Sequence, residues 1–182
     1  MQLNDQVMKK CILLGIMFIL CLSCNPKKRK LQQIVRQWIG KEVIFAGTEA
    51  KVLGCDTVWE DWQTSRFKIL HYVDTSGCTS CRLRLYEWGQ FIDSMAVEFP
   101  ETAVVFVLTL ENYKEFEQLA KINRFDFPVL YDREGRMDSL NHFPAIPALQ
   151  TFLLDGNNQV LAIGDPVKNE AVRQLYRKKM KP

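Results

Sequence analysis

"RFKILHYVDTSGCTSC", residues 66–81, joins an apolar run to two cysteines, Cys78 and Cys81, that lie three positions apart. The run "RFKILHYV" is mostly apolar and aromatic, which is typical of a β-strand. The residues that follow at spacings of three and four predict one face of a helix; they are Cys81, Leu85, Trp88, Ile92 and Met95. We therefore expect a strand-to-helix loop, with the helix starting at or just after Cys78 and Cys81 one turn further on.

The segments on either side predict an α/β fold. Expected helices cover 31–39, ending at Gly40, then 112–122 with Asn112 as its cap, and 167–180 with Val172, Leu175 and Tyr176 facing inward. Expected strands cover "EVIF" (42–45), "TAVVFVLTL" (102–110), "FPVLYD" (127–132), "LQTFLLD" (149–155) and "QVLAIG" (159–164), with a turn at "REGR" and a hairpin at "GNN". This order favours a mostly parallel sheet with an antiparallel hairpin at its C-terminal end.

The start of the chain carries a targeting signal. Residues 8–24, "MKKCILLGIMFILCLSC", place two lysines before an apolar run that is short for a membrane span, which is the pattern of a signal peptide. Cys24 directly after this run resembles the lipidated cysteine of bacterial lipoproteins, with a plain secretory signal or an uncleaved anchor as the alternatives. We therefore expect a signal peptide over 1–23, a lipid-anchored tether and short helix over 24–40, a domain over 41–182, and a location in the cell envelope facing the periplasm.

That location matters for the cysteines and the charge. Of six cysteines, four remain after residue 23, and with Cys24 lipidated and Cys78 and Cys81 forming a local pair, Cys55 is left over. We expect Cys55 to be buried and inert, with a bond to another chain as the lesser alternative. The formal net charge of +3 falls to +2 when 1–23 are removed, which is too small to indicate a nucleic-acid partner.

The expected loop makes the two cysteines unequal. Unpaired N–H groups at a helix start favour a thiolate, so the pKa of Cys78 should fall below the ordinary value of about 8.5. Cys81 would be sheltered on the apolar face and suited to resolving a mixed disulfide. Asp74, at the strand end, could relay protons to Cys81, although an aspartate there often only caps a turn.

Three uses of the pair stay open on this basis: dithiol redox chemistry, an inert disulfide on a binding module, and a metal site. A zinc site would need two further ligands at a recognisable spacing. A Cu(I) carrier would need a distant histidine, for which His142 is a weak candidate, whereas His71 lies inside a strand and is expected to be structural. Thr75-x-x-Cys78 also matches part of the peroxiredoxin nucleophile loop, but His71 stands where that loop usually has proline.

"CTSCR", "VVFVLTL", "FDFPVLYDREGR" and "QTFLLDGNNQVLAIG", in this order over roughly residues 66–180, resemble the TlpA/ResA-type membrane-anchored thiol-disulfide oxidoreductases. The resemblance implies a thioredoxin-like three-layer sandwich and exchange of protein disulfides at Cys78 and Cys81. It implies no bound cofactor, protein disulfides as substrates, and a membrane electron donor or acceptor as a second partner.

The same resemblance shows where this chain departs from its pattern. "VDTSGC" replaces an aromatic lead-in to the first cysteine, and Tyr86 stands where a proline is common. The family's cis-proline precedes the strand "TFLLD", and Pro147 is the nearest proline, two residues earlier than the usual spacing, which falls on Leu149. Either a two-residue insertion lets Pro147 take this role, with its preceding peptide bond cis, or the cis-proline is missing; we favour the first alternative.

Overall fold

The computed structural model describes residues 26–75 and 83–181. Residues 37–182 form a compact unit of their own, separate from residues 1–36. The described helices are α2 (Pro26–Trp38), α3 (Asp61–Thr64), α5 (Leu85–Glu98), α6 (Tyr113–Ile122), α7 (Arg136–Asn141), the 3₁₀ turn η1 (Pro147–Leu149) and α8 (Glu170–Met180). The strands are β1 (Glu49–Val52), β2 (Cys55–Asp56), β3 (Phe67–Val73), β4 (Thr102–Leu108), β5 (Val129–Tyr131), β6 (Thr151–Asp155) and β7 (Val160–Ile163).

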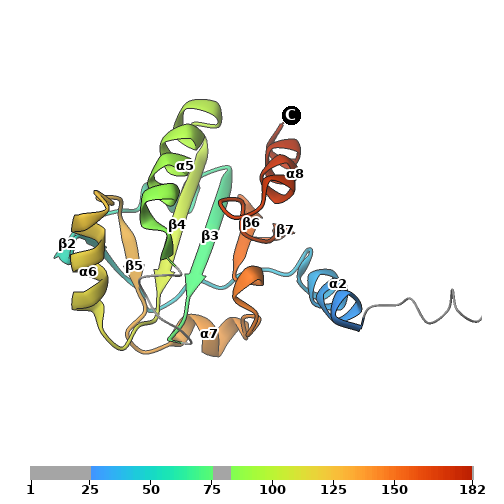
Figure 1. The fold of residues 1–182 in the computed structure, drawn as a ribbon, viewed down its shortest axis with the longest axis horizontal. Coiled ribbons are helices and arrows are strands. Elements are labelled where there is room, and N and C mark those ends of the chain that lie inside the picture. The colour runs from blue at the N-terminus through green and yellow to red at the C-terminus, as the bar shows by residue number, and fades with distance from the viewer. Residues whose placement is uncertain (1–25, 76–82, 182) are drawn as a thin grey trace, which may run out of the picture. The chain divides into compact units, whose positions relative to one another are not determined.

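The seven strands form one sheet in the order β2-β1-β5-β4-β3-β6-β7 (Figure 1). β3 pairs parallel with β4, and β4 with β5, while the other four pairings are antiparallel. The prediction of a mostly parallel sheet was therefore wrong in this respect, because the β1–β2 hairpin and β6 each join the parallel centre in the opposite direction. β6 and β7 form the antiparallel pair that "GNN" predicted.

The centre of the sheet is built from two largely apolar segments, β3 and β4. Ile69 and Leu70 of β3 and Val105 and Phe106 of β4 are fully buried. Seven consecutive residue pairs join β3 to β4 in register. Because these strands are covered on both faces, almost every side chain is apolar instead of every second one.

One face of the sheet is covered by α5, α6 and α8. A single core cluster joins these helices to the sheet; from the helices it includes Leu85, Trp88, Phe91 and Met95, Phe116 and Ala120, and Tyr176 and Met180. Leu175 is 41% exposed, so its predicted inward position was wrong. The predicted inward position of Tyr176 is confirmed, and its hydroxyl donates to Gly164 O at 2.9 Å.

The opposite face carries a cluster of aromatic rings. Phe143 stacks on Tyr72 of β3 with ring centroids 4.3 Å apart, and on Trp38 at 5.6 Å. Trp38 also contacts Phe152 of β6 at 4.8 Å. Helices on one face and this aromatic layer on the other bury the sheet on both sides.

Residues 40–43 run along the outer edge of β7. The N–H of Gly40 donates to Val160 O at 2.8 Å, and the N–H of Val160 donates to Lys41 O at 3.0 Å. An isolated bridge joins Glu42 to Gln159. The predicted strand "EVIF" is therefore reduced to one bridge, but this segment pairs the backbone groups of an edge that would otherwise be open to other chains.

Asn141, at the end of α7, fixes the segment that follows residue 43. Its side chain is 1% exposed, donates to Ile44 O and to Met137 O at 2.8 Å each, and accepts from the N–H of Ile44 at 2.9 Å. Asn141→Ala should lower the free energy of unfolding by about 2–3 kcal/mol, because buried backbone groups lose their partners. Urea denaturation would measure this, with Ser139→Ala on the exposed side of α7 as the control; equal effects of the two substitutions would contradict the role of Asn141.

No helix within the described ranges is both long and apolar enough to cross a membrane.

Candidate functional site

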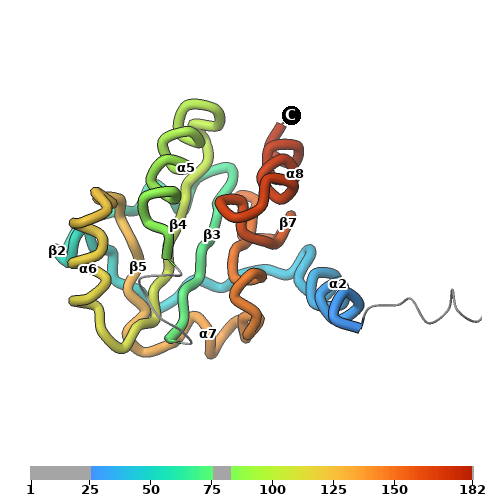
Figure 2. Tube along the Cα trace, in the orientation of Figure 1, coloured from blue at the N-terminus to red at the C-terminus, as the bar shows by residue number. Residues whose placement is uncertain are grey.

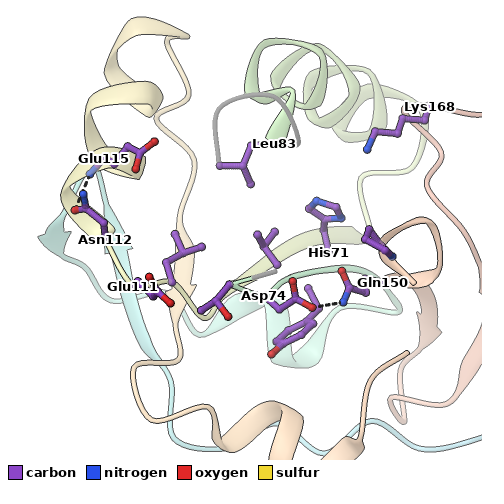
Figure 3. A pocket seen from close by; sticks show the side chains of 13 residues that line it. His71, Asp74, Leu83, Glu111, Asn112, Glu115, Gln150 and Lys168 are labelled. Atoms are coloured by element: carbon purple, nitrogen blue, oxygen red, sulfur yellow. Dashed lines mark hydrogen bonds between the residues drawn. The ribbon is translucent and has the colours of Figure 1, made fainter. Parts of the chain in front are cut away.

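A pocket of about 150 Å³ opens at the end of the sheet where β3 and β4 finish (Figure 3). Its lining residues come from five parts of the chain; they are His71, Tyr72, Val73, Asp74, Thr75, Leu83, Leu110, Glu111, Asn112, Glu115, Pro147, Gln150 and Lys168. Both apolar and ionisable side chains therefore line it.

The topology explains why these residues meet. β3, β4 and β5 are parallel, so their C-terminal ends reach the same edge of the sheet, which the trace in Figure 2 shows. β6 runs antiparallel to β3, so the segment that precedes β6 lies at this edge as well. The carboxyl ends of parallel strands are where α/β proteins place their ligands.

Asp74 follows β3 and is held by Gln150. Gln150 Nε2 donates to Asp74 Oδ2 at 2.7 Å, and Gln150 is itself 4% exposed. The N–H of Tyr72 donates to Gln150 O at 2.9 Å, which joins the two segments through the backbone as well. The carboxylate of Asp74 therefore has a defined position on the pocket wall.

His71 is a buried part of the pocket lining. Its side chain is 7% exposed, its Nδ1 lies 2.8 Å from Thr151 Oγ1, and its ring packs against Trp88 and Phe106 at centroid distances of 4.7 and 5.0 Å. Burial lowers the pKa of His71 to about 4; the negative charge of Asp165 opposes this effect and the positive charge of Lys168 adds to it. The imidazole is thus neutral at physiological pH.

The low pKa of His71 predicts a pH dependence of stability. Unfolding returns the pKa of His71 to about 6.5. Between about pH 6.5 and pH 4 the unfolded chain therefore binds a proton that the folded chain does not bind, and the free energy of unfolding falls as the pH is lowered through this range. The loss should reach about 3 kcal/mol by pH 4. His71→Asn should flatten this part of the curve of unfolding free energy against pH, while His142→Asn, at an exposed position, should keep the wild-type slope. A wild-type slope in His71→Asn would contradict the assignment.

Pro147 lines the pocket, but its predicted cis peptide bond was wrong. No peptide bond within 26–75 or 83–181 is cis. Pro147 is the first residue of η1, and the N–H of Leu149 donates to Ile146 O at 2.8 Å. A trans proline suits the first position of such a turn because its fixed φ fits and no N–H is needed there.

Cys78, Cys81 and Cys24 lie outside the described residues. The residues that bracket the pair, Thr75 and Leu83, both line the pocket. α5 begins only at Leu85, after Arg84 in a left-handed conformation with φ 43° and ψ 47°. One unbroken helix from Cys78 into α5 is therefore excluded, because a left-handed residue interrupts the helical backbone.

Two other predicted candidates lie away from the pocket. His142 is exposed at the C-terminal end of α7, with φ 56°, and does not line the pocket. Cys55 is exposed on β2, so the expectation that it would be buried was wrong. β2 is a short edge strand, which gives a side chain little cover. Among the described residues, no three His, Cys, Asp or Glu side chains are grouped to hold a metal ion.

Glu111, Glu115, Gln150 and Lys168 join the site without having been predicted. Glu111 follows the predicted strand 102–110, and Glu115 lies in the first turn of the helix that Asn112 caps, its N–H donating to Asn112 Oδ1 at 3.3 Å. For Glu111 and Glu115, a place just after the C-terminal end of a parallel strand was the available signal.

Sheet order and pocket position together define a thioredoxin-like α/β fold, and known structures agree. No protein-family model and no curated protein matches the chain. A putative thiol:disulfide interchange protein DsbE from Chlorobium tepidum is 20% identical, with a TM-score of 0.57 over 78% of this chain and 99% of that one. The thioredoxin domain of a thiol-disulfide oxidoreductase from Bacteroides vulgatus is 12% identical, with a TM-score of 0.54 over 76% and 97%. AhpC from Enterococcus faecalis is 16% identical, with a TM-score of 0.55 over 78% and 92%. The predicted thioredoxin-like fold is confirmed.

Proposed function

We propose that this protein is a thiol-disulfide oxidoreductase that exchanges protein disulfides through Cys78 and Cys81. The observation that carries the proposal is the position of Thr75 and Leu83, which bracket the cysteine pair and both line the pocket. A dithiol placed there would lie at the sheet edge where α/β proteins carry out their chemistry.

The exchange proceeds in two steps. The Cys78 thiolate attacks one sulfur of a substrate disulfide, forms a mixed disulfide and expels the other sulfur as a thiolate. Cys81 loses its proton, for which Asp74 is the candidate acceptor, and attacks the Cys78 sulfur, which releases the second substrate thiol. The substrate gains two electrons and the Cys78–Cys81 pair loses two, so a membrane electron donor must reduce the pair again; the reverse direction would need an acceptor.

The proposed setting is the bacterial cell envelope. A signal peptide over 1–23 would direct export, and lipid on Cys24 would anchor a tether over 24–40 so that the domain over 41–182 faces the periplasm. The apolar run from Cys11 to Leu22 and the cysteine that follows support this arrangement. Disulfide substrates are abundant in such an oxidising compartment.

The presence of two cysteines favours this function over a peroxidase, although AhpC has the same fold. A peroxidase needs only the first cysteine of the loop as its nucleophile. Cys81, three residues after Cys78, supplies in addition the resolving thiol that a dithiol exchanger needs. His71 also occupies the position of the proline in the peroxiredoxin loop, and it is packed into the core beside Trp88.

A redox titration tests the proposal. Residues 25–182 with Cys55→Ser, in which Cys78 and Cys81 are the only cysteines, are equilibrated in glutathione buffers of graded potential and the free thiols are then alkylated. We expect one two-electron transition in which Cys78 and Cys81 change together, identified by peptide mass. Independent modification of the two cysteines, with no disulfide between them at any potential, would contradict the proposal and favour a redox-inert binding module.

A further inference from the structure

The pocket is of a size that suits a side chain. Its volume is about 150 Å³. Pockets for cofactors and small molecules usually exceed about 300 Å³. A single long side chain of a bound polypeptide fits this space.

The charged residues of the pocket lining are mostly acidic. Asp74, Glu111 and Glu115 supply three carboxylates against one cation, Lys168. Lys168 Nζ already lies 3.7 Å from Asp165 Oδ2, on a carboxylate that is 6% exposed. Neither Glu111 nor Glu115 forms an ion pair with any residue of 26–75 or 83–181, so their charges are available to a ligand.

His71 adds a neutral polar group to the pocket lining. Its Nδ1 is occupied by Thr151 Oγ1 at 2.8 Å, while Nε2 has no hydrogen-bond partner within the described chain. Figure 3 shows the ring among the side chains that surround the pocket. Because the imidazole is neutral, it adds no positive charge that would oppose a bound cation.

The apolar lining completes the chemical description. Val73, Leu83 and Leu110 line the pocket together with the carboxylates. Lysine and arginine combine an apolar stem with a cationic head, and they bury the stem while the head stays near water or a carboxylate.

We propose that the pocket binds a lysine or arginine side chain next to the disulfide of the polypeptide substrate, with its stem on the apolar lining and its cation at Glu111 and Glu115. This inference rests on the proposed function for the identity of the substrate. It assigns to Glu111 and Glu115 the selection of basic substrates, separate from the chemistry of the cysteines.

Matched peptides test this selection. Three disulfide peptides differ only in the residue beside the cysteine, which is lysine, norleucine or glutamate, and the full-length chain is assayed for kcat/KM with each. We expect about a tenfold preference for lysine over glutamate that falls with added salt, as for two partly screened ion pairs. The double variant Glu111→Gln, Glu115→Gln should lose most of the preference, while the control Glu60→Gln, outside the pocket lining, should keep it.

Binding of serine analogues, which cannot exchange disulfides, separates the two proposals. Exchange at equal rates for all three peptides, or a preference that persists in the double variant, would overturn the inference and leave the oxidoreductase standing. A lysine preference in calorimetric binding of the serine analogues, without exchange of any disulfide peptide, would support the pocket assignment and overturn the oxidoreductase.

Discussion

Replacing Cys78 with serine is expected to slow disulfide exchange by about 10³-fold or more, because the reaction loses its attacking sulfur. A serine hydroxyl is almost fully protonated at neutral pH and forms no stable bond to sulfur. The rate of reduction of a disulfide peptide, measured with a chemical reductant that recharges the enzyme, would show the loss as a change in kcat/KM.

Cys55→Ser is the matched control for this substitution. Cys55 is exposed but lies on β2, away from the pocket lining, so its loss should leave kcat/KM within about twofold of the wild type. A Cys78→Ser variant with the activity of the control would refute Cys78 as the nucleophile. Unfolding curves of both variants should overlay that of the wild type, so that a loss of folding is not mistaken for a loss of chemistry.

Trp88→Ala is expected to give the largest loss of stability, about 3–5 kcal/mol. Trp88 is 1% exposed in the first turn of α5, and its ring packs against Phe91 at 5.5 Å and Phe106 at 5.1 Å as well as against His71. Alanine would leave a cavity between α5 and the sheet directly beneath the pocket. The loss is a large part of the 5–15 kcal/mol that usually separates folded from unfolded domains.

Val97→Ala on the same helix controls for changes in helix propensity. Val97 is 85% exposed, so this variant should stay within about 0.5 kcal/mol of the wild type. Guanidinium denaturation gives the change in free energy of unfolding for both variants. It is obtained from the shift of the transition midpoint when the dependence of the free energy on denaturant concentration is unchanged. If Trp88→Ala costs less than about 1 kcal/mol, Trp88 is not the centre of the core as described.

The long regular elements could be predicted because their patterns are strong. The segments 66–73 and 102–110 were read as strands and form β3 and β4, while 112–122 forms α6 with Asn112 as its cap. Each has either a continuous apolar run or a clear helical period, together with a boundary residue whose chemistry is specific.

The short elements between residues 46 and 66 could not be predicted. β1 and β2 total six residues, and their two-residue turn places Leu53 at φ 50° before Gly54 at φ 86°. Leucine rarely adopts a left-handed conformation. Because Leu53 stands where asparagine or aspartate would precede glycine in a typical hairpin turn, the sequence gives no signal for a turn here. Pairing with β5, a tertiary contact, determines this hairpin.

The candidate site was predictable only where side chains follow a recognisable strand. Asp74 could be placed at the end of β3, but its partner Gln150 lies 76 positions further along and carries no local signal. His71 was expected to be structural, because it lies inside a strand. Its place in the pocket lining depends on contacts that are distant in sequence, so the sequence alone did not reveal it. Pro147 could be placed near the site because it lies just before a recognisable strand. The conformation of its peptide bond could not be predicted, because it depends on the turn η1.

The most direct test of the central claim is capture of the mixed disulfide. Residues 25–182 carrying Cys81→Ser in a Cys55→Ser background, which leaves Cys78 as the only cysteine, are mixed with a disulfide peptide, quenched with acid and weighed by mass spectrometry. The account predicts a one-to-one adduct linked through Cys78, because no resolving thiol can release it, and no adduct in the matched Cys78→Ser chain. Equal adducts on the two variants, or none on either, would contradict the division of roles between Cys78 and Cys81 and with it the proposed oxidoreductase.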